Sequence, residues 1–428
     1  MRRTLRFLSF ALLALIVTAL VALTLIAKLL LAPATGEWTV PWRVGPVTLD
    51  VGVPTAMRLL TSPWLAPRLA GFDTDTRFGP VRLGWEDASS SLTLDCAPCS
   101  ASVPALGTQP LRVAQFTVTV RRDGNRLFGR FDAKPDKGGA TVAGADGAES
   151  LRGRWDGRLS QTSLQVGVDT DDAPITRWYA VLAPDLQELR QARIGGSLAL
   201  HGRIVWPDGE LALQPRVAQF RVEGLGTEAV AGARSNGCGP SARLANDSWL
   251  ARAVLAAEDQ RFFTHPGYDL VELGAAASGN HKAGAAERGA STLTQQLAKL
   301  LFTGSERSSE RKLRELLYAV EMEETLGKAR ILQLYLDNAP WGGTVCGAEA
   351  AAKRYFGRSA RALEPVQAVW LAAMLHKPAA ELAEWRRNGS IDAARVKWVA
   401  EGIRGISRNQ REALLKSVAA ARFAPPPP

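Results

Sequence analysis

The sequence is poor in histidine and cysteine, with four residues of each kind among 428. No histidine pair stands at the spacing of zinc ligands, so we expect no structural zinc site. Acidic residues are also scarcer than basic ones, 42 against 52, which gives a net charge of +10. This charge would permit nucleic-acid binding, but neither zinc-finger spacing nor an aromatic RNA-binding signature accompanies it. We therefore expect no nucleic-acid partner and assign the positive charge to anionic head groups or pyrophosphates.

The four cysteines can form disulfides if the chain is exported. Cys96 and Cys99 are separated by two residues, whereas Cys238 and Cys346 lie in glycine-flanked segments. Three connectivities exist and sequence cannot distinguish them, but we favour Cys96 with Cys99 and Cys238 with Cys346. A redox motif at 96–99 is the alternative, and the surrounding sequence lacks a thioredoxin-like pattern.

Charge is absent from residues 7–27, which follow a hexapeptide with three arginines. This stretch is long enough to span a bilayer, for which about 20 residues are needed. It exceeds the apolar core of a signal peptide, although the small residues at 32–34 resemble a cleavage site. The arginines predict a cytoplasmic N-terminus. We expect residues 1–36 to form a cytoplasmic tip and one transmembrane helix of the bacterial inner membrane, with the rest of the chain in the periplasm.

The remaining chain is long enough for more than one domain. Residues 37–224 contain alternating apolar runs between turn signals, which predicts a strand-rich α+β domain. Two patterns recur there in the same order, Leu-x-Val-Gly-Val at 49 and 164 and Arg-Val-Ala-Gln-Phe-x-Val at 112 and 216. A helix-like stretch lies between them in each copy. The recurrence predicts a duplicated β-helix-β unit.

Beyond this domain the composition and the apolar periodicity of the sequence change. Residues 225–240 are rich in glycine, alanine and serine and are predicted to be a linker. Helical periodicity then predicts a mainly α domain over 241–380, followed by a helical tail and proline-rich end at 381–428. Within the α domain, residues 251–263 are predicted to form an amphipathic helix whose last turn carries Glu258 and Asp259.

Charged and amide side chains gather in three segments of the α domain. They are Glu258 and Asp259 in the first, Thr292, Gln296 and Lys299 on one helix face in the second, and Arg311, Lys312 and Glu315 in the third. Each segment alone is explained by a helix cap or an exposed helix face with an ion pair. Together they suit sugar transfer from a phosphate leaving group, which needs a carboxylate to accept a hydroxyl proton and cations to hold pyrophosphate.

These segments resemble the motifs of the peptidoglycan glycosyltransferases of glycosyltransferase family 51, which also occur as a module of class A penicillin-binding proteins. The first motif matches Glu258-Asp259-x-x-Phe262-x-x-His265-x-Gly267, the second matches 289–299 and the third matches 311–315. Two more match at 331–336 and 347–357. The resemblance covers 248–378 in five ordered motifs.

This resemblance implies a lysozyme-like fold, with lipid II and the lipid-linked glycan strand as substrates. Glu258 would deprotonate the acceptor hydroxyl for an inverting transfer, and Glu315 would act with cations on the departing diphosphate-lipid. The residues expected to bind substrate are Asp259, Phe262, His265, Thr292, Gln296, Lys299, Arg311 and Lys312. No cofactor is obligatory, while a divalent cation such as Mg²⁺ would suit the diphosphate. Too little chain follows Pro378 for a transpeptidase, so we expect a monofunctional polymerase that works with cell-wall synthesis proteins.

Two residues depart from the family pattern. Leu300 stands where the family usually has Asn after the lysine, and Asp337 where it usually has Asn in the fourth motif. Leu300 predicts weak or narrowly specific activity. Two alternatives stay open, a non-catalytic envelope scaffold that binds through 37–224 and a glycan-cleaving enzyme. The pairing of Lys299 with Arg311 favours a phosphate leaving group over cleavage.

Overall fold

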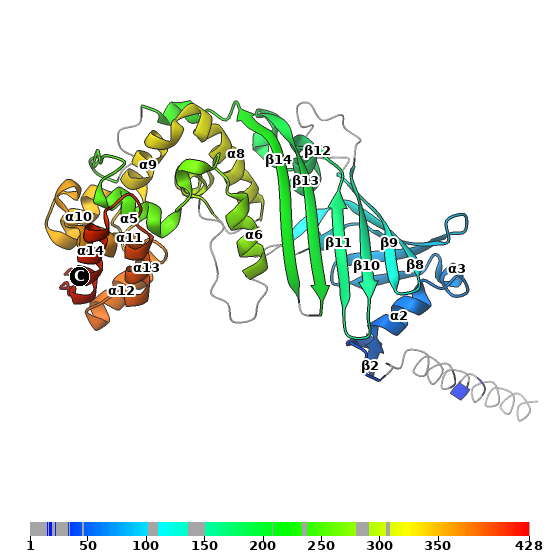
Figure 1. The fold of residues 1–428 in the computed structure, drawn as a ribbon. Helices are drawn as coiled ribbons and strands as arrows, with labels where there is room; N and C mark the ends of the chain where they lie inside the picture. The colour runs from blue at the N-terminus through cyan, green and yellow to red at the C-terminus, as the bar shows by residue number, and fades with distance from the viewer. Residues whose placement is uncertain are drawn as a thin grey trace, which may run out of the picture.

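The computed structural model describes residues 35–44, 47–101, 110–135, 150–207, 209–232, 238–279, 291–304 and 309–427, with residues 15, 17, 18, 22 and 33. They form a strand-rich part and a helical part that lie side by side (Figure 1). No helix built from these residues is long and apolar enough to cross a membrane. The transmembrane helix predicted within 1–36 falls outside the described residues, apart from the isolated positions.

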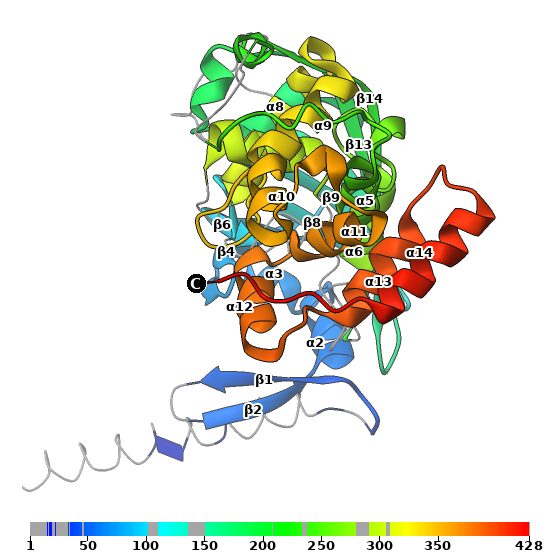
Figure 2. The same ribbon diagram turned by 90° about the vertical axis from the view of Figure 1, so that its left-hand side faces the viewer.

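The strand-rich part is built on a ten-stranded antiparallel sheet in the order β12-β13-β11-β10-β9-β8-β5-β4-β3, with β14 paired to β13. Its strands are β3 (Asp73–Thr76), β4 (Gly79–Glu86), β5 (Ser91–Cys96), β8 (Gln115–Asp123), β9 (Arg126–Lys134), β10 (Leu151–Leu159), β11 (Leu164–Thr170), β12 (Ala173–Pro174), β13 (Arg193–Trp206) and β14 (Glu210–Glu223). Two strand pairs stand apart from the sheet, β1 (Thr39–Val44) with β2 (Val47–Gly52), and β6 (Cys99–Ala101) with β7 (Leu111–Val113). The β1–β2 pair lies below α2 and α12 in Figure 2.

One face of the sheet is covered and the other is open. Along β10, Leu151 and Leu159 are buried, while Arg152 and Arg158 on the other face are exposed, as expected for an antiparallel strand with one solvated side. Helices α2 (Val53–Leu60), α3 (Ala66–Leu69) and α4 (Ile175–Leu182) pack on the apolar face. The prediction of a strand-rich region is thereby confirmed.

The two recurring sequence patterns have different settings in this architecture. The second copies fall in β11 and β14 of the large sheet. The first copies fall in β2, which pairs only with β1, and in β7–β8, of which β8 belongs to the large sheet. A helix, α2 or α4, follows in both cases. The order of strand and helix is therefore shared while the strand pairing is not, and the duplication stays a prediction.

The helical part surrounds one buried helix. Its helices are α5 (Trp249–Glu258), α6 (Leu270–Gly279), α7 (Leu293–Ala298), α8 (Ser309–Thr325), α9 (Gly327–Asn338), α10 (Ala348–Phe356), α11 (Pro365–Met374), α12 (Pro378–Asn388), α13 (Ala393–Gly402) and α14 (Arg408–Ala420). Residues 367–374 of α11 are all buried, with α5 and α13 against them. The Cys238–Cys346 disulfide joins the chain before α5 to the loop before α10, and Cys96–Cys99 is the second disulfide. Both favoured pairings are confirmed.

Helix α8 joins the two parts of the molecule. Tyr179 in α4 donates a hydrogen bond from its hydroxyl to the Leu313 carbonyl at 3.0 Å, and Arg314 pairs with the buried Glu188 at 2.6 Å. One apolar core continues from α4 into the helical part. The strand-rich part therefore holds α8 directly.

The segment expected to be a linker also lies partly against α8. The carboxylate of Glu321 in α8 accepts hydrogen bonds from the backbone N–H groups of Leu225 and Thr227, at 2.7 and 3.2 Å. Both of these residues are buried. Residues 225–227 thus contribute to the junction between the two parts.

Candidate active site

Glu258 is the last residue of α5, a helix capped at its start by the Ser248 side chain. The sequence predicted a helix that continues to residue 263, and this is wrong, because Asp259 adopts an extended backbone with φ −159° and ψ 80°. A short 3₁₀ turn over Phe262–Thr264 follows. The break sends the two adjacent carboxylates into different surroundings.

The Glu258 carboxylate lies among three polar side chains. Gln296 donates a hydrogen bond from Nε2 to Glu258 Oε2 at 3.0 Å, and Tyr335 donates to Gln296 Oε1 at 2.9 Å. Arg395 Nη2 lies 3.5 Å from Glu258 Oε1. Burial raises the pKa of Glu258, while Gln296 and Arg395 partly oppose that rise. A carboxylate with raised proton affinity that can still ionise is suited to general-base chemistry.

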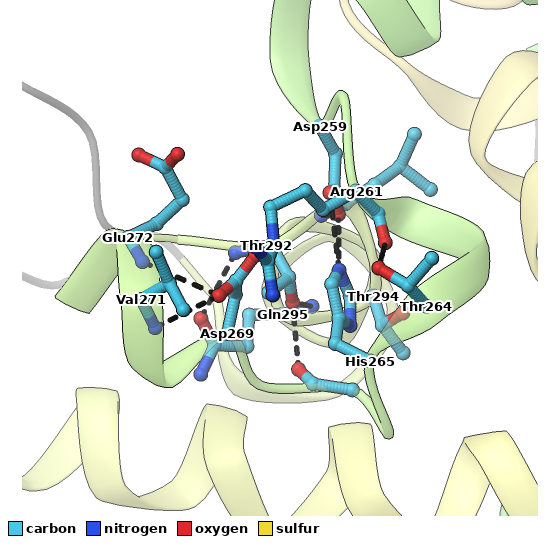
Figure 3. Close-up of polar contacts among 12 residues, drawn as sticks. Asp259, Arg261, Thr264, His265, Asp269, Val271, Glu272, Thr292, Thr294 and Gln295 are labelled. Atoms are coloured by element: carbon cyan, nitrogen blue, oxygen red, sulfur yellow. Dashed lines mark hydrogen bonds and ion pairs between the residues drawn. The ribbon is translucent and has the colours of Figure 1, made fainter.

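Asp259 has other hydrogen-bond partners than Glu258 has. His265 Nε2 lies 3.0 Å from both of its oxygens, and the backbone N–H of Leu293 donates to Oδ2 at 2.8 Å (Figure 3). Its negative charge faces the N-terminus of α7, where the helix dipole stabilises an anion. Asp259 therefore fixes the end of α5 to the start of α7.

Thr292 and Phe262, two other residues predicted to bind substrate, contact protein groups near the site. Thr292 caps α7 with Gln295 in a reciprocal capping box and donates to the Gly267 carbonyl at 2.7 Å. Phe262 is buried, with the Lys328 ammonium 4.4 Å from its ring centroid. These contacts hold the local backbone in place, and substrate binding by Thr292 and Phe262 stays a prediction. Gly289, at the start of the second motif, lies outside the described residues.

A second group of charges surrounds Glu315 in α8. Only 1% of Glu315 is exposed, and both Arg311 and Lys312 bond to its carboxylate, the latter at 2.9 Å. Lys312 also donates to the Ser291 hydroxyl. Burial and the charges of Arg311 and Lys299 lower the pKa of Lys312 to about 8, despite the carboxylate beside it. The Lys312 charge is therefore sensitive to mildly alkaline pH.

Helix α7 connects the two groups. Gln296 reaches Glu258 from this helix, and Lys299, three residues later, begins a π-helical turn over Lys299–Thr303. Such turns occur frequently at functional sites. Lys299 is exposed and lies close enough to Lys312 to lower its pKa. Lys299, Arg311 and Lys312 therefore form a cluster of cations around Glu315, referred to below as the cation cluster.

Sequence reasoning assigned no role to two residues at Glu258. Arg395 belongs to α13, 137 positions further along the chain, and no local pattern marks it. Tyr335 stands in the fourth matched motif, and that match is the signal that could have identified it. The contacts to Gln296 and Glu258 place both side chains in the same cluster.

The two departures from the family pattern differ in their consequences. Asp337 accepts hydrogen bonds from the Ser241 hydroxyl at 2.5 Å and the Ala242 N–H at 3.0 Å, and thereby ties the start of the helical part to α9. Leu300 is 38% exposed beside Lys299. Its side chain adds an apolar surface next to the cations.

Within the described part of the chain, no three His, Cys, Asp or Glu side chains gather closely enough to hold a metal ion. Glu315 is bonded to two cations and Asp259 to His265. The acidic groups of the site therefore do not converge on a common point.

Comparison with known proteins gives concordant matches. Residues 242–403 match the family model described as transglycosylase. A biosynthetic peptidoglycan transglycosylase of Shewanella oneidensis is 44% identical over 169 residues, 40% of this chain and 70% of that protein. Proteins of the same name from Alcanivorax borkumensis and Nitrosomonas eutropha are 44% and 46% identical over 35% and 30% of this chain. The chain spans 61% and 53% of the length of these two relatives.

Proposed function

The chain belongs to the peptidoglycan transglycosylase family, glycosyltransferase family 51, and from this premise we propose that it polymerises glycan strands from lipid II. The observation that carries the proposal is the presence of a largely buried carboxylate, Glu258, whose side chain is 10% exposed, together with a separate cluster of Lys299, Arg311 and Lys312. Glycosyl transfer from a diphosphate needs a base at the attacking hydroxyl and positive charge at the leaving group.

Glu258 is the proposed general base. An acceptor sugar hydroxyl loses its proton to Glu258 as its oxygen bonds to the donor's anomeric carbon, with inversion there. The Gln296 hydrogen bond orients the carboxylate, and Tyr335 holds the Gln296 amide in turn. The charge of Arg395 lowers the pKa of Glu258 and so opposes the effect of burial.

The cation cluster is proposed to receive the diphosphate. The bond between the anomeric carbon and the diphosphate oxygen breaks as the new glycosidic bond forms, and its electron pair stays on the diphosphate. Lys299, Arg311 and Lys312 stabilise that negative charge. Glu315 positions Arg311 and Lys312 through its two ion pairs. These cations supply the required charge without a resident cofactor, and a divalent cation carried by the diphosphate would add to it.

We place the helical part in the periplasm and the predicted helix within 7–27 in the inner membrane. The apolar run and the preceding arginines support this placement. The lysozyme-like fold, the lipid-linked strand as second substrate and an association with cell-wall synthesis proteins belong to the same proposal.

Polymerisation of labelled lipid II by the purified full-length protein tests the proposal. Glu258→Gln should lower the rate about 10²–10⁴-fold, the usual contribution of a general base. Glu324→Gln is the matched control, because this glutamate is exposed on α8. If Glu258→Gln polymerises as fast as the wild type, Glu258 is not the base. If the wild type makes no polymer where a known relative does, the proposed activity is wrong.

A further inference from the structure

An apolar groove of about 170 Å³ separates the sheet from the helical part. Its lining includes Trp178, Leu198 and Val217 on the sheet side and Leu273, Leu313 and Leu316 on the helical side. Figure 1 shows α6 and α8 alongside β14, in agreement with their contacts. Helix α4 and strands β13 and β14 of the strand-rich part therefore form one wall of this groove.

The lining of the groove also includes polar residues, one of which belongs to the cation cluster. Gln295 and Lys312 are among the lining residues, and Lys312 also bonds to Glu315. Asp269, the acidic residue of the lining, pairs with Arg261 at 2.7 Å. The groove thus combines mostly apolar walls with a lysine of the cation cluster. A ligand that matches it carries an apolar chain attached to an anionic group.

We propose that this groove holds the isoprenoid chain next to the diphosphate of the lipid-linked substrate. This inference rests on the proposed function. The walls present few polar groups for sugar or peptide, whereas each buried CH₂ group of a chain favours binding about fourfold. The family match begins at residue 242, so the sheet wall lies outside the region shared with the family. The strand-rich part would then contribute to substrate binding.

Binding of farnesyl diphosphate and of inorganic diphosphate to the full-length protein in phosphatidylcholine nanodiscs tests the inference. The wild type should bind farnesyl diphosphate at least about tenfold more tightly than Val217→Trp does. Both proteins should bind inorganic diphosphate equally, because the cations are unchanged. Ala218→Trp is the matched control, since this exposed neighbour lies on the other face of β14. Val217→Phe serves as a milder block if the tryptophan variant does not fold.

Crosslinking is a second measurement, which locates the bound isoprenoid chain directly. Farnesyl diphosphate with a photoreactive diazirine at the chain end should crosslink to peptides of β13 and β14. Equal farnesyl affinity in Val217→Trp and wild type, or crosslinks confined to other segments, would overturn the groove assignment.

Polymerisation measured in parallel distinguishes failure of the groove assignment from failure of the proposed function. Polymer formation with unaltered farnesyl binding by Val217→Trp overturns the groove alone. A wild type that binds the chain in the groove but makes no polymer overturns the function and leaves a prenyl-diphosphate site.

Discussion

Glu258 takes its proton affinity from opposing neighbours. Burial raises its pKa and the nearby Asp259 charge adds to that rise, whereas Gln296 and Arg395 lower it. Each opposing group comes from a different helix, so the balance depends on the tertiary fold. The pH dependence of the reaction should therefore also depend on Gln296 and Arg395.

Arg395→Met should move the acidic limb of the kcat/KM profile to higher pH. Removal of the positive charge 3.5 Å from the carboxylate raises the pKa of Glu258, so a larger fraction is protonated at neutral pH. At pH values above the shifted limb the rate should approach that of the wild type. Arg395→Lys retains the charge and serves as control. An unshifted limb in Arg395→Met would show that another group sets the acidic side.

Deprotonation of Lys312 should produce a fall in the polymerisation rate on the alkaline side of the pH–rate profile. Its pKa is lowered to about 8 by burial and by Arg311 and Lys299, so the ammonium is charged below that pH and loses its charge above it. Polymerisation should fall above pH 8 as one cation of the diphosphate site disappears. In Lys312→Arg the guanidinium stays charged, and the fall should vanish from the pH–rate profile. A fall at the same pH in this variant would contradict the assignment to Lys312.

At the scale of elements, the junction between α5 and α7 fixes the site. Asp259 connects the end of α5 to the Leu293 N–H of α7, and Thr292 connects α7 to the Gly267 carbonyl. Asp259 directly follows Glu258 in the chain, and Thr292 and Leu293 lie in the turn of α7 that precedes Gln296. Loss of one contact should therefore loosen two helices together.

Asp259→Ala should lower the free energy of unfolding by about 3 kcal/mol, because His265 and the buried Leu293 N–H both lose a charged partner. Asp259→Asn should cost less, since its amide oxygen can still accept from Leu293. Urea denaturation followed by circular dichroism measures the difference. Asp247→Ala removes an exposed carboxylate just before α5 and should change stability by less than about 0.5 kcal/mol. Equal losses for Asp259→Ala and Asp247→Ala would refute the structural role.

The sequence predicted the segments that carry the site residues better than it predicted the contacts between those segments. Periodicity and motif matches located the segments that carry Glu258, Gln296 and Glu315. The end of α5 at residue 258 was missed because the partners of Asp259 come from positions 265 and 293. Arg395 was missed for the same reason. Alternation predicted strands in 37–224, but pairing into one ten-stranded sheet depends on contacts between distant segments that local patterns do not encode.

At the scale of the molecule, α8 serves both parts. Arg311, Lys312 and Glu315 belong to the site, while Leu313 and Arg314 bond to α4 and to Glu188 in the strand-rich part. The continuous core beneath these contacts suggests that the two parts unfold together.

Glu188→Ala should lower the free energy of unfolding by about 2 kcal/mol, because a buried carboxylate is removed and Arg314, itself partly exposed, loses its partner. A thermal scan should show one cooperative transition at lower temperature. Glu223→Ala breaks the exposed pair with Arg193 and should have an effect below about 1 kcal/mol. Two separated transitions would contradict a shared core.

Helix α8 contacts both parts of the molecule, and this limits which domains could replace the helical part. Composition changes near residue 240, which suggests a domain that could be exchanged for that of a relative. An incoming domain would have to bring a helix that carries the diphosphate cations on one side and offers partners for Tyr179 and Glu188 on the other. A transplant that lacks those partners would leave a buried hydroxyl and a buried carboxylate unsatisfied. The strand-rich and helical parts are therefore expected to be inherited as a pair.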